Sequence, residues 1–206
     1  HHHYSNSNGR SMYMQLSGTS QATAVAGGSA SLAREYLREV AGINKPSASL
    51  IKATLINGAE DLGTPDIPNA NEGWGQIDLE NSLNPSSSGV SLDVFQDDER
   101  ELQAGFSLIY SFDIDGSKGI DITLAWSDAE ASANAAQSES RLLNNLDLIL
   151  IAPDGTSYLG NQFSSGISTT GGSADGLNNI ERIRIPAGAT TQNGDWMVTV
   201  EHKGGD

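Results

Sequence analysis

The chain has 206 residues, no cysteine and a formal net charge of −15, with 26 acidic against 11 basic side chains. The absence of cysteine excludes disulfides, thiolate metal centres and cysteine nucleophiles. The acidic balance argues against nucleic acid as a partner, because phosphate contacts need lysine and arginine. No apolar run approaches the roughly 18 residues of a membrane-spanning helix, so neither nucleic acid nor a membrane is expected as a partner.

The N-terminus begins with His1–His3 and continues as a polar stretch of serine, asparagine and glycine. Three leading histidines are typical of the remnant of a purification tag. We therefore assign residues 1–10 to a tag or linker and leave them out of the functional argument.

Residues 11–84 are predicted to be mainly helical. From Ser20, small apolar residues recur at helical spacing for about 20 residues, and Gly42 follows as a stop signal. Because this helix carries mostly alanine, glycine and serine, we expect it to lie buried against neighbouring backbone. A second helix is predicted to be capped by Ser47 and to stop at Gly58.

The segment Asn84–Gly89, with the sequence NPSSSG, is a break in composition, and we place the domain boundary there. In residues 85–206 the apolar period switches to two, in short segments separated by turn signals such as Asp115-Gly116 and Asp154-Gly155. Short strands with one apolar face are typical of an antiparallel sandwich or a jelly roll. The predicted fold is therefore a helical part followed by an all-β antiparallel, jelly-roll-like sandwich.

The run Gly18-Thr19-Ser20 places a serine where a loop becomes a small-sided helix. A helix N-terminus offers free backbone N–H groups and the positive end of the helix dipole. Both would favour an oxyanion that forms beside the Ser20 hydroxyl. An ordinary helix N-cap is the alternative that the spacing alone leaves open for Ser20.

Five oxygen-bearing side chains in the second domain are candidate ligands for a hard cation. Asn145 and Asp147 are two apart on a predicted strand and so project to one face. Asp128 ends a strand, and Asp175 and Glu181 flank a loop. Oxygen ligands from several loops suit Ca²⁺ better than zinc. The alternative is that these side chains only cap turns.

The serine segment resembles the nucleophile motif of subtilases, whose usual form is Gly-Thr-Ser-x-Ala-x-Pro-x-Val-Ala-Gly. Five positions match without a gap, namely Gly18, Thr19, Ser20, Ala22 and Gly28. Ala24 stands where the family usually has proline, a departure that should alter helix packing rather than chemistry. Two later segments resemble those that close a subtilase catalytic domain, namely Lys52–Gly58 and Gly73-Trp74-Gly75 with Ile77-Asp78.

The second half is similar to the C-terminal β-sandwich of certain bacterial alkaline subtilases. The similarity lies in Trp126-Ser127-Asp128, in Asn144–Leu148 and in Asp175–Glu181. The resemblance implies the C-terminal part of a subtilisin-like α/β catalytic domain at residues 11–84, followed by a sandwich in which bound calcium is plausible. It also implies a secreted, extracellular bacterial serine endopeptidase that acts on polypeptides.

The resemblance implies that Ser20 forms an acyl-enzyme, with Gly18, Thr19 and the Ser20 N–H at the oxyanion and substrate side. The triad histidine and aspartate should precede the serine in the chain. Upstream of Ser20 there are only 19 residues, with no aspartate and only the leading histidines, and the remaining histidine is His202. We therefore expect the triad partners to lie outside the chain, in the N-terminal remainder of the catalytic domain, and this chain alone to be inactive. The competing hypothesis is a non-catalytic accessory sandwich that stabilises the peptidase or binds substrate or cell-surface material.

Overall fold

The computed structural model describes residues 4–5, 11–13, 17–63, 66–97, 102–133, 140–188 and 192–204. His1–His3 and most of the predicted tag or linker therefore lie outside the described residues. The short strands β1 (Tyr4–Ser5) and β2 (Ser11–Tyr13) pair as an antiparallel ribbon, so the predicted tag or linker contributes one strand. None of the described helices has the length and apolar character of a membrane span.

Two helices lie where the sequence predicts them. Helix α1 spans Thr19–Glu39 and is followed by Gly42 in the left-handed conformation, with a φ of 75° that favours glycine. Helix α2 spans Ala48–Asn57, and the Ser47 hydroxyl caps it by accepting the N–H of Leu50 at 3.1 Å. A short helix α3 (Leu79–Leu83) and a 3₁₀ turn, η1 (Pro85–Ser88), complete the helical part.

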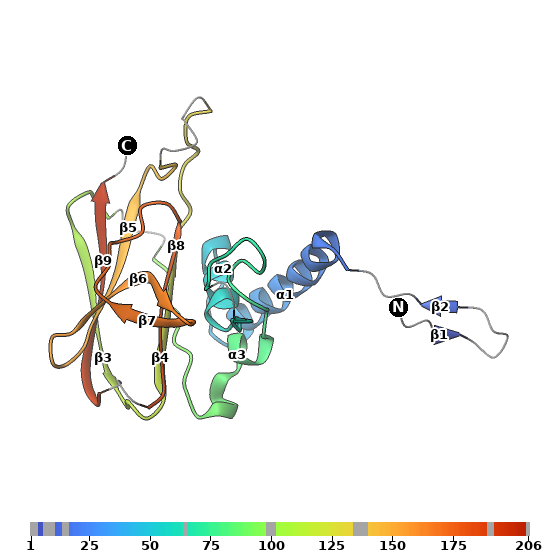
Figure 1. Ribbon diagram of the computed structural model, residues 1–206, viewed down its shortest axis with the longest axis horizontal. Helices are drawn as coiled ribbons and strands as arrows, with labels where there is room; N and C mark the ends of the chain where they lie inside the picture. The colour runs from blue at the N-terminus through green and yellow to red at the C-terminus, as the bar shows by residue number, and fades with distance from the viewer. Residues whose placement is uncertain are drawn as a thin grey trace.

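The expectation that α1 is buried is wrong for its N-terminal half. Only Ser29, Ala33 and Leu37 of this helix are buried, where it packs on α2 and α3. Val25 in this half is 64% exposed, and Leu32 on the same face further along the helix is 51% exposed. Figure 1 shows the beginning of α1 projecting away from the rest of the molecule. Small side chains allow close packing, but burial also requires a neighbour on that face, and the described part of the chain supplies none for residues 19–25.

The second half forms two antiparallel sheets, so the prediction of a β-rich, antiparallel domain is confirmed. A five-stranded sheet has the order β3-β9-β5-β6-β7, and β4 pairs with β8 in a second sheet. The jelly-roll detail and the boundary after residue 84 stay predictions. The strands are β3 (Ser107–Ile114), β4 (Gly119–Ala125), β5 (Asn145–Ile151), β6 (Ser157–Ser164), β7 (Ile167–Thr170), β8 (Ile180–Pro186) and β9 (Gly194–Gly204).

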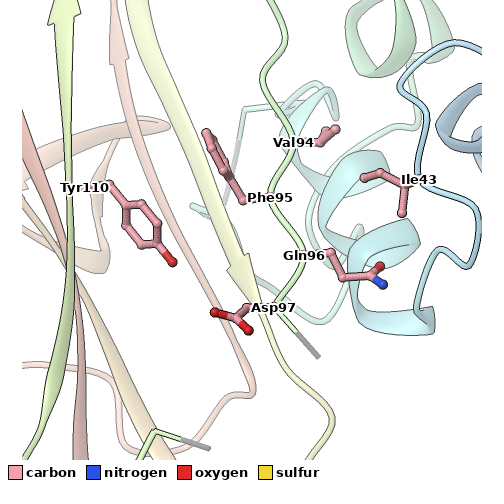
Figure 2. A pocket seen from close by; sticks show the side chains of 6 residues that line it. All are labelled: Ile43, Val94, Phe95, Gln96, Asp97 and Tyr110. Carbon is pink, nitrogen blue, oxygen red and sulfur yellow. The ribbon is translucent and has the colours of Figure 1, made fainter. Parts of the chain in front are cut away.

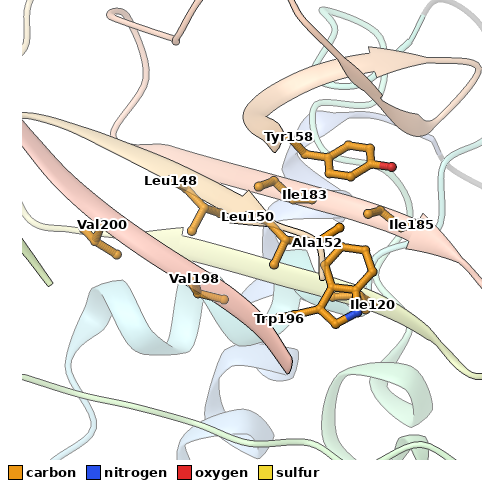
Figure 3. Close-up of a cluster of buried hydrophobic side chains, with 10 residues drawn as sticks. All are labelled: Ile120, Leu148, Leu150, Ala152, Tyr158, Ile183, Ile185, Trp196, Val198 and Val200. Atoms are coloured by element: carbon orange, nitrogen blue, oxygen red, sulfur yellow. The ribbon is translucent and has the colours of Figure 1, made fainter. Parts of the chain in front are cut away.

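The sandwich core lies between the two sheets and follows the period-two pattern (Figure 3). The indole of Trp196 is 1% exposed, packs at 6.4 Å from the ring of Tyr158, and donates its N–H to the Gln192 carbonyl at 2.9 Å. Each fully buried large apolar side chain contributes about 1.5–3 kcal/mol. The core consists of Ile120, Leu148, Leu150, Ala152, Tyr158, Ile183, Ile185, Trp196, Val198 and Val200.

The helical part packs against the β4–β8 side of the sandwich, with α2 in contact with β4 (Figure 1). The Thr123 hydroxyl of β4 donates to the Asn57 side-chain oxygen at the end of α2, at 2.9 Å. In the segment between the two parts, the Gln96 side chain accepts the N–H of Ser47 and donates to the Lys45 carbonyl, at 2.8 and 2.9 Å. The helical part is therefore hydrogen-bonded both to β4 and to the segment that leads into the sandwich.

Candidate functional site

Ser20 is the second residue of α1, and the residue at the N-cap position is Gly18. The structure therefore overturns the N-cap alternative for Ser20, since no side chain caps this helix. Gly18, Thr19 and Ser20 are all exposed. The Gly18 backbone is extended, with a φ of 160°. The serine hydroxyl is thus presented to solvent at the point where the loop enters the helix.

The backbone around Ser20 provides hydrogen-bond donors. The N–H of Ala22 makes an intrahelical bond to the Gly18 carbonyl, at 3.2 Å. The amides of Thr19, Ser20 and Gln21 precede that bond, in the first turn, where N–H groups lack intrahelical partners. Together with the helix dipole they favour negative charge beside the Ser20 hydroxyl. The first turn of α1 can therefore stabilise an oxyanion, but it contains no base.

The described part of the chain holds one histidine, and it lies in the sandwich. His202 is on β9, is 8% exposed, and its Nδ1 is 2.6 Å from the Leu102 carbonyl oxygen. Figure 1 shows β9 and the beginning of α1 on opposite sides of the molecule. A serine hydroxyl is a weak nucleophile without an adjacent base. His202 cannot be that base for Ser20 in this arrangement.

Two of the five predicted metal ligands act as turn-stabilising carboxylates in this structure. Asp128 accepts the backbone N–H groups of Leu143 and Asn144, at 2.7 and 3.2 Å, and the Asn144 amide at 2.7 Å. Burial would raise the pKa of Asp128, but these hydrogen bonds outweigh it and hold the pKa below its usual value. Asp175 accepts the backbone N–H of Leu177 at 2.8 Å and three further hydrogen bonds within and near its loop.

The other three predicted ligands each carry a buried oxygen atom with no hydrogen-bond partner. These atoms are Oδ1 of Asn145, Oδ1 of Asp147 and Oε1 of Glu181. Asp147 and Glu181 are only 2% and 1% exposed. An ionised carboxylate that is buried without a partner is strongly unfavourable. A bound cation would satisfy all three atoms together, whereas a buried water or protons on the carboxyl groups would satisfy them separately.

The three side chains come from neighbouring elements. Asn145 and Asp147 lie on β5, and Glu181 lies on β8, where its Oε2 accepts the N–H of Leu148. The negative charges of Asp147 and Asp175 add to the raised pKa of Glu181, and the charge of Asp175 adds to the raised pKa of Asp147, so the three carboxyl groups lie near one another. In the described ranges, no three His, Cys, Asp or Glu side chains form a ready-made metal centre. A cation here would also need the Asn145 amide and water or backbone oxygens, in keeping with the six to eight ligands of Ca²⁺.

Burial dominates the electrostatics of this cluster. It raises the pKa of Glu181 to about 8, with the Leu148 N–H opposing the rise and the charges of Asp147 and Asp175 adding to it. Burial also raises the pKa of Asp147, against the opposing positive charge of Lys203. A divalent cation beside these groups would reverse the shift, because it favours the ionised form.

Sequence reasoning missed two residues that shape this region. Gly160 on β6 leaves the space into which the Glu181 carboxylate extends, because a Cβ there would collide with it. Arg182 is 1% exposed and forms an ion pair with Asp121 at 2.7 Å. The available signal for Arg182 was its place in β8. Because Glu181 alternates with Ile183 and Ile185 on one face of the strand, Arg182 must point to the opposite face.

An open hollow lies between the segment before β3 and the sandwich (Figure 2). Its volume is about 440 Å³, and Phe95 and Tyr110 lie on one side of it with their ring centroids 5.8 Å apart. Gln96, at its other side, is bound to the backbone of Lys45 and Ser47. The hollow is lined by Ile43, Val94, Phe95, Gln96, Asp97 and Tyr110.

Residues 2–75, which include Ser20, match the model of the subtilase family. The chain is also 37% identical over 191 residues to the serine protease/ABC transporter B family protein tagA of Dictyostelium discoideum, across 85% of this chain and 11% of that protein. It is 30% identical over 228 residues to the corresponding protein tagB of the same organism, across 84% of this chain and 12% of that protein. The chain thus spans only about a tenth of the length of these curated relatives.

Proposed function

Because residues 2–75 match the model of the subtilase family, we propose that the chain is a segment of a serine endopeptidase that cleaves polypeptides through an acyl-enzyme on Ser20. The observation that carries this proposal is the exposed Ser20 hydroxyl within the first turn of α1, inside the matched range. The relatives named as serine proteases support the same reaction class.

In the proposed reaction the Ser20 Oγ attacks the scissile carbonyl carbon and a histidine removes its proton. The Ser20 N–H stabilises the oxyanion, while Gly18 and Thr19 border the substrate. The C–N bond then breaks, the leaving amine takes the proton from the histidine, and water hydrolyses the acyl-enzyme. The histidine and its orienting aspartate come from the N-terminal remainder of the catalytic domain, so the chain alone is inactive.

An exposed face of α1 supports such a partner. Val25 and Leu32 present apolar surface to solvent on a helix whose small side chains suit close packing. We assign this face to the contact with the remainder of the catalytic domain. An extracellular location and a polypeptide substrate are proposed on the family alone, and a bacterial source stays a prediction.

Hydrolysis of a peptide substrate tests this proposal. The longer parent protein should cleave the substrate, and its Ser20→Ala variant should lose that activity. The matched control is Ser31→Ala on the same helix, because the Ser31 hydroxyl bonds only the Gly27 carbonyl, at 3.1 Å. The proposal fails if the Ser20→Ala parent retains full activity, or if the isolated chain cleaves peptides in a Ser20-dependent way.

We also propose that the sandwich binds a structural Ca²⁺ through Asn145, Asp147 and Glu181, which favours a stabilising role for the accessory domain. The observation behind it is the set of three buried oxygen atoms without partners. When bound, the ion would neutralise the buried negative charge and tie β5 to β8. Asp128 and Asp175 would then support the surrounding loops rather than the ion.

Calcium titration with isothermal calorimetry and thermal unfolding tests the cation proposal. A ligand present at 100 times its dissociation constant stabilises the folded state by about 2.7 kcal/mol. We expect this stabilisation in the wild-type chain and its loss in the double variant Asp147→Asn/Glu181→Gln. The control is Asp113→Asn on the exposed face of β3, which should bind calcium normally. Equal thermal midpoints with calcium and with a chelator would contradict the proposal.

A further inference from the structure

Arg182 on β8 ties the sandwich to the C-terminal end of α2. Its Nε and Nη2 donate to the two carboxylate oxygens of Asp121 on β4, at 2.9 and 2.7 Å. Its Nη2 also donates to the Asn57 carbonyl at 2.8 Å, and its Nη1 to the Ala59 carbonyl at 3.3 Å. The last carbonyls of a helix lack intrahelical partners, and a cation there also favours the helix dipole. A buried guanidinium from the sandwich thus completes the end of α2.

The backbone that presents Arg182 is fixed by one side chain of β6. Asn161 accepts the N–H of Arg182 at 2.9 Å and donates to the Ile180 carbonyl at 2.8 Å. The same amide donates to the Asp175 carboxylate at 2.6 Å. Asn161 has a φ of 62°, a left-handed conformation that asparagine tolerates better than most residues. It therefore joins β6, the loop at Asp175 and the first residues of β8.

Glu181 precedes Arg182, and successive side chains of a strand point to opposite faces. Glu181 extends toward β5 and β6, where it meets the Leu148 N–H and passes over Gly160. Arg182 extends toward α2. The cluster of buried oxygens and the contact with α2 are thus held by adjacent residues on one strand.

We propose that β8 couples cation binding in the sandwich to the docking of α2, with Arg182 as the positioning residue. This inference rests on the proposed cation site. A cation held by Glu181 fixes the beginning of β8, and with it the guanidinium that binds the end of α2. The sandwich then supports the helix that packs on α1, and so the element that carries Ser20.

Hydrogen exchange of the whole chain, measured by mass spectrometry with and without calcium, tests the coupling. The reporters for the end of α2 are the hydrogen-bonded amides of Gly58, Ala59 and Glu60, which directly follow its last residue, Asn57. Coupling between two sites typically changes an equilibrium about 5- to 150-fold. We expect calcium to slow exchange at these amides at least about fivefold in the wild-type chain. In Arg182→Met this effect should vanish, while the amides of β5 beside the cation cluster are still protected by calcium.

Arg184→Met is the matched control. Arg184 lies on the same strand, its Nε is 3.7 Å from the same Asp121 carboxylate, and it is more exposed than Arg182. It should retain the calcium effect at α2. If Arg182→Met does not fold, Arg182→Lys replaces it. A lysine keeps the charge beside Asp121 but lacks the planar fork that reaches both carbonyls, so the effect at α2 should again be lost.

The outcomes separate this inference from the cation proposal. Calcium binding in the calorimeter without any change at the α2 amides overturns the coupling and leaves the cation site intact. A calcium effect at α2 that persists in both Arg182 variants also overturns it. No calcium binding at all overturns both proposals. The coupling must also act in the reverse direction. Arg182→Met should weaken the calcium affinity by the same factor by which calcium strengthens the docking of α2 in the wild-type chain.

Discussion

Removing the ionisable group of Glu181 should change how the stability of the metal-free chain depends on pH. The folded-state pKa of Glu181 is about 8, against an ordinary value of 4.5. Between these values the unfolded chain releases the proton and the folded chain keeps it. The stabilisation is therefore complete below pH 4.5 and is lost as the pH rises toward 8.

The magnitude follows from the size of the shift. Between the two pKa values, the folded chain binds one proton more than the unfolded chain. Each pH unit in that range therefore changes the free energy of unfolding by about 1.36 kcal/mol. Over the interval from 4.5 to 8, Glu181 alone accounts for a loss on the order of 5 kcal/mol. Asp147, which faces Glu181 and also has a raised pKa, acts in the same direction, as the negative charge of Asp175 does. Glu181→Gln should remove most of this dependence.

Urea unfolding in metal-free buffer at half-unit steps from pH 4.5 to 8.5 measures the effect. The wild-type chain should lose stability across this range, and Glu181→Gln should give a flatter profile. The exposed Glu60→Gln serves as the control with the wild-type slope. Saturating calcium should flatten the wild-type profile as well, because the bound ion favours the ionised carboxylate. Parallel profiles for the wild type and Glu181→Gln would refute the reasoning.

Three further predictions concern packing and capping. Leu150→Ala, at a fully buried position in the sandwich core, should lower the free energy of unfolding by about 2–5 kcal/mol, as measured by urea unfolding; a loss below about 1 kcal/mol would contradict the assigned core. Ser47→Ala removes the cap that accepts the Leu50 N–H and should cost about 1 kcal/mol, whereas an unchanged urea midpoint would show that the cap is not formed. Val25→Ser on the exposed half of α1 should change the stability of this chain by less than about 0.5 kcal/mol. The same change should lower peptidase activity in the longer parent, and equal effects in the two proteins would argue against a partner on that face.

The sequence predicted the elements whose signals are local. The Ser47 cap and the glycine stop at Gly42 placed the two helices, because capping and left-handed turns depend on neighbouring residues. The period-two pattern placed the sandwich strands for the same reason. The burial of α1 was not predictable in this way. The burial of α1 depends on whether another element packs over Val25 and Leu32. The composition of the helix does not say whether such an element is present.

The candidate sites also differ in whether their contacts are local or join residues that are distant in the sequence. Turn-capping by Asp128 and Asp175 uses contacts close in the chain or within adjoining loops, and the sequence had offered capping as an alternative. The convergence of Asp147 and Glu181 needs two strands far apart in sequence to come together. Arg182 was missed because its partners are the carbonyls of residues 57 and 59, more than 120 positions away. The catalytic role of Ser20 stays a prediction that rests on its motif and its position.

Fluorophosphonate labelling of Ser20, read by intact mass and compared with Ser20→Ala, tests the central claim most directly. In the longer parent, one reagent molecule should attach to each protein molecule, and this adduct should be absent from Ser20→Ala, because the reaction requires an activated serine. The isolated chain should remain unlabelled under the same conditions, since the residues that the structure describes place no base beside Ser20. A parent that stays unlabelled, or one that is labelled equally well after Ser20→Ala, would contradict the assignment of Ser20 as the nucleophile.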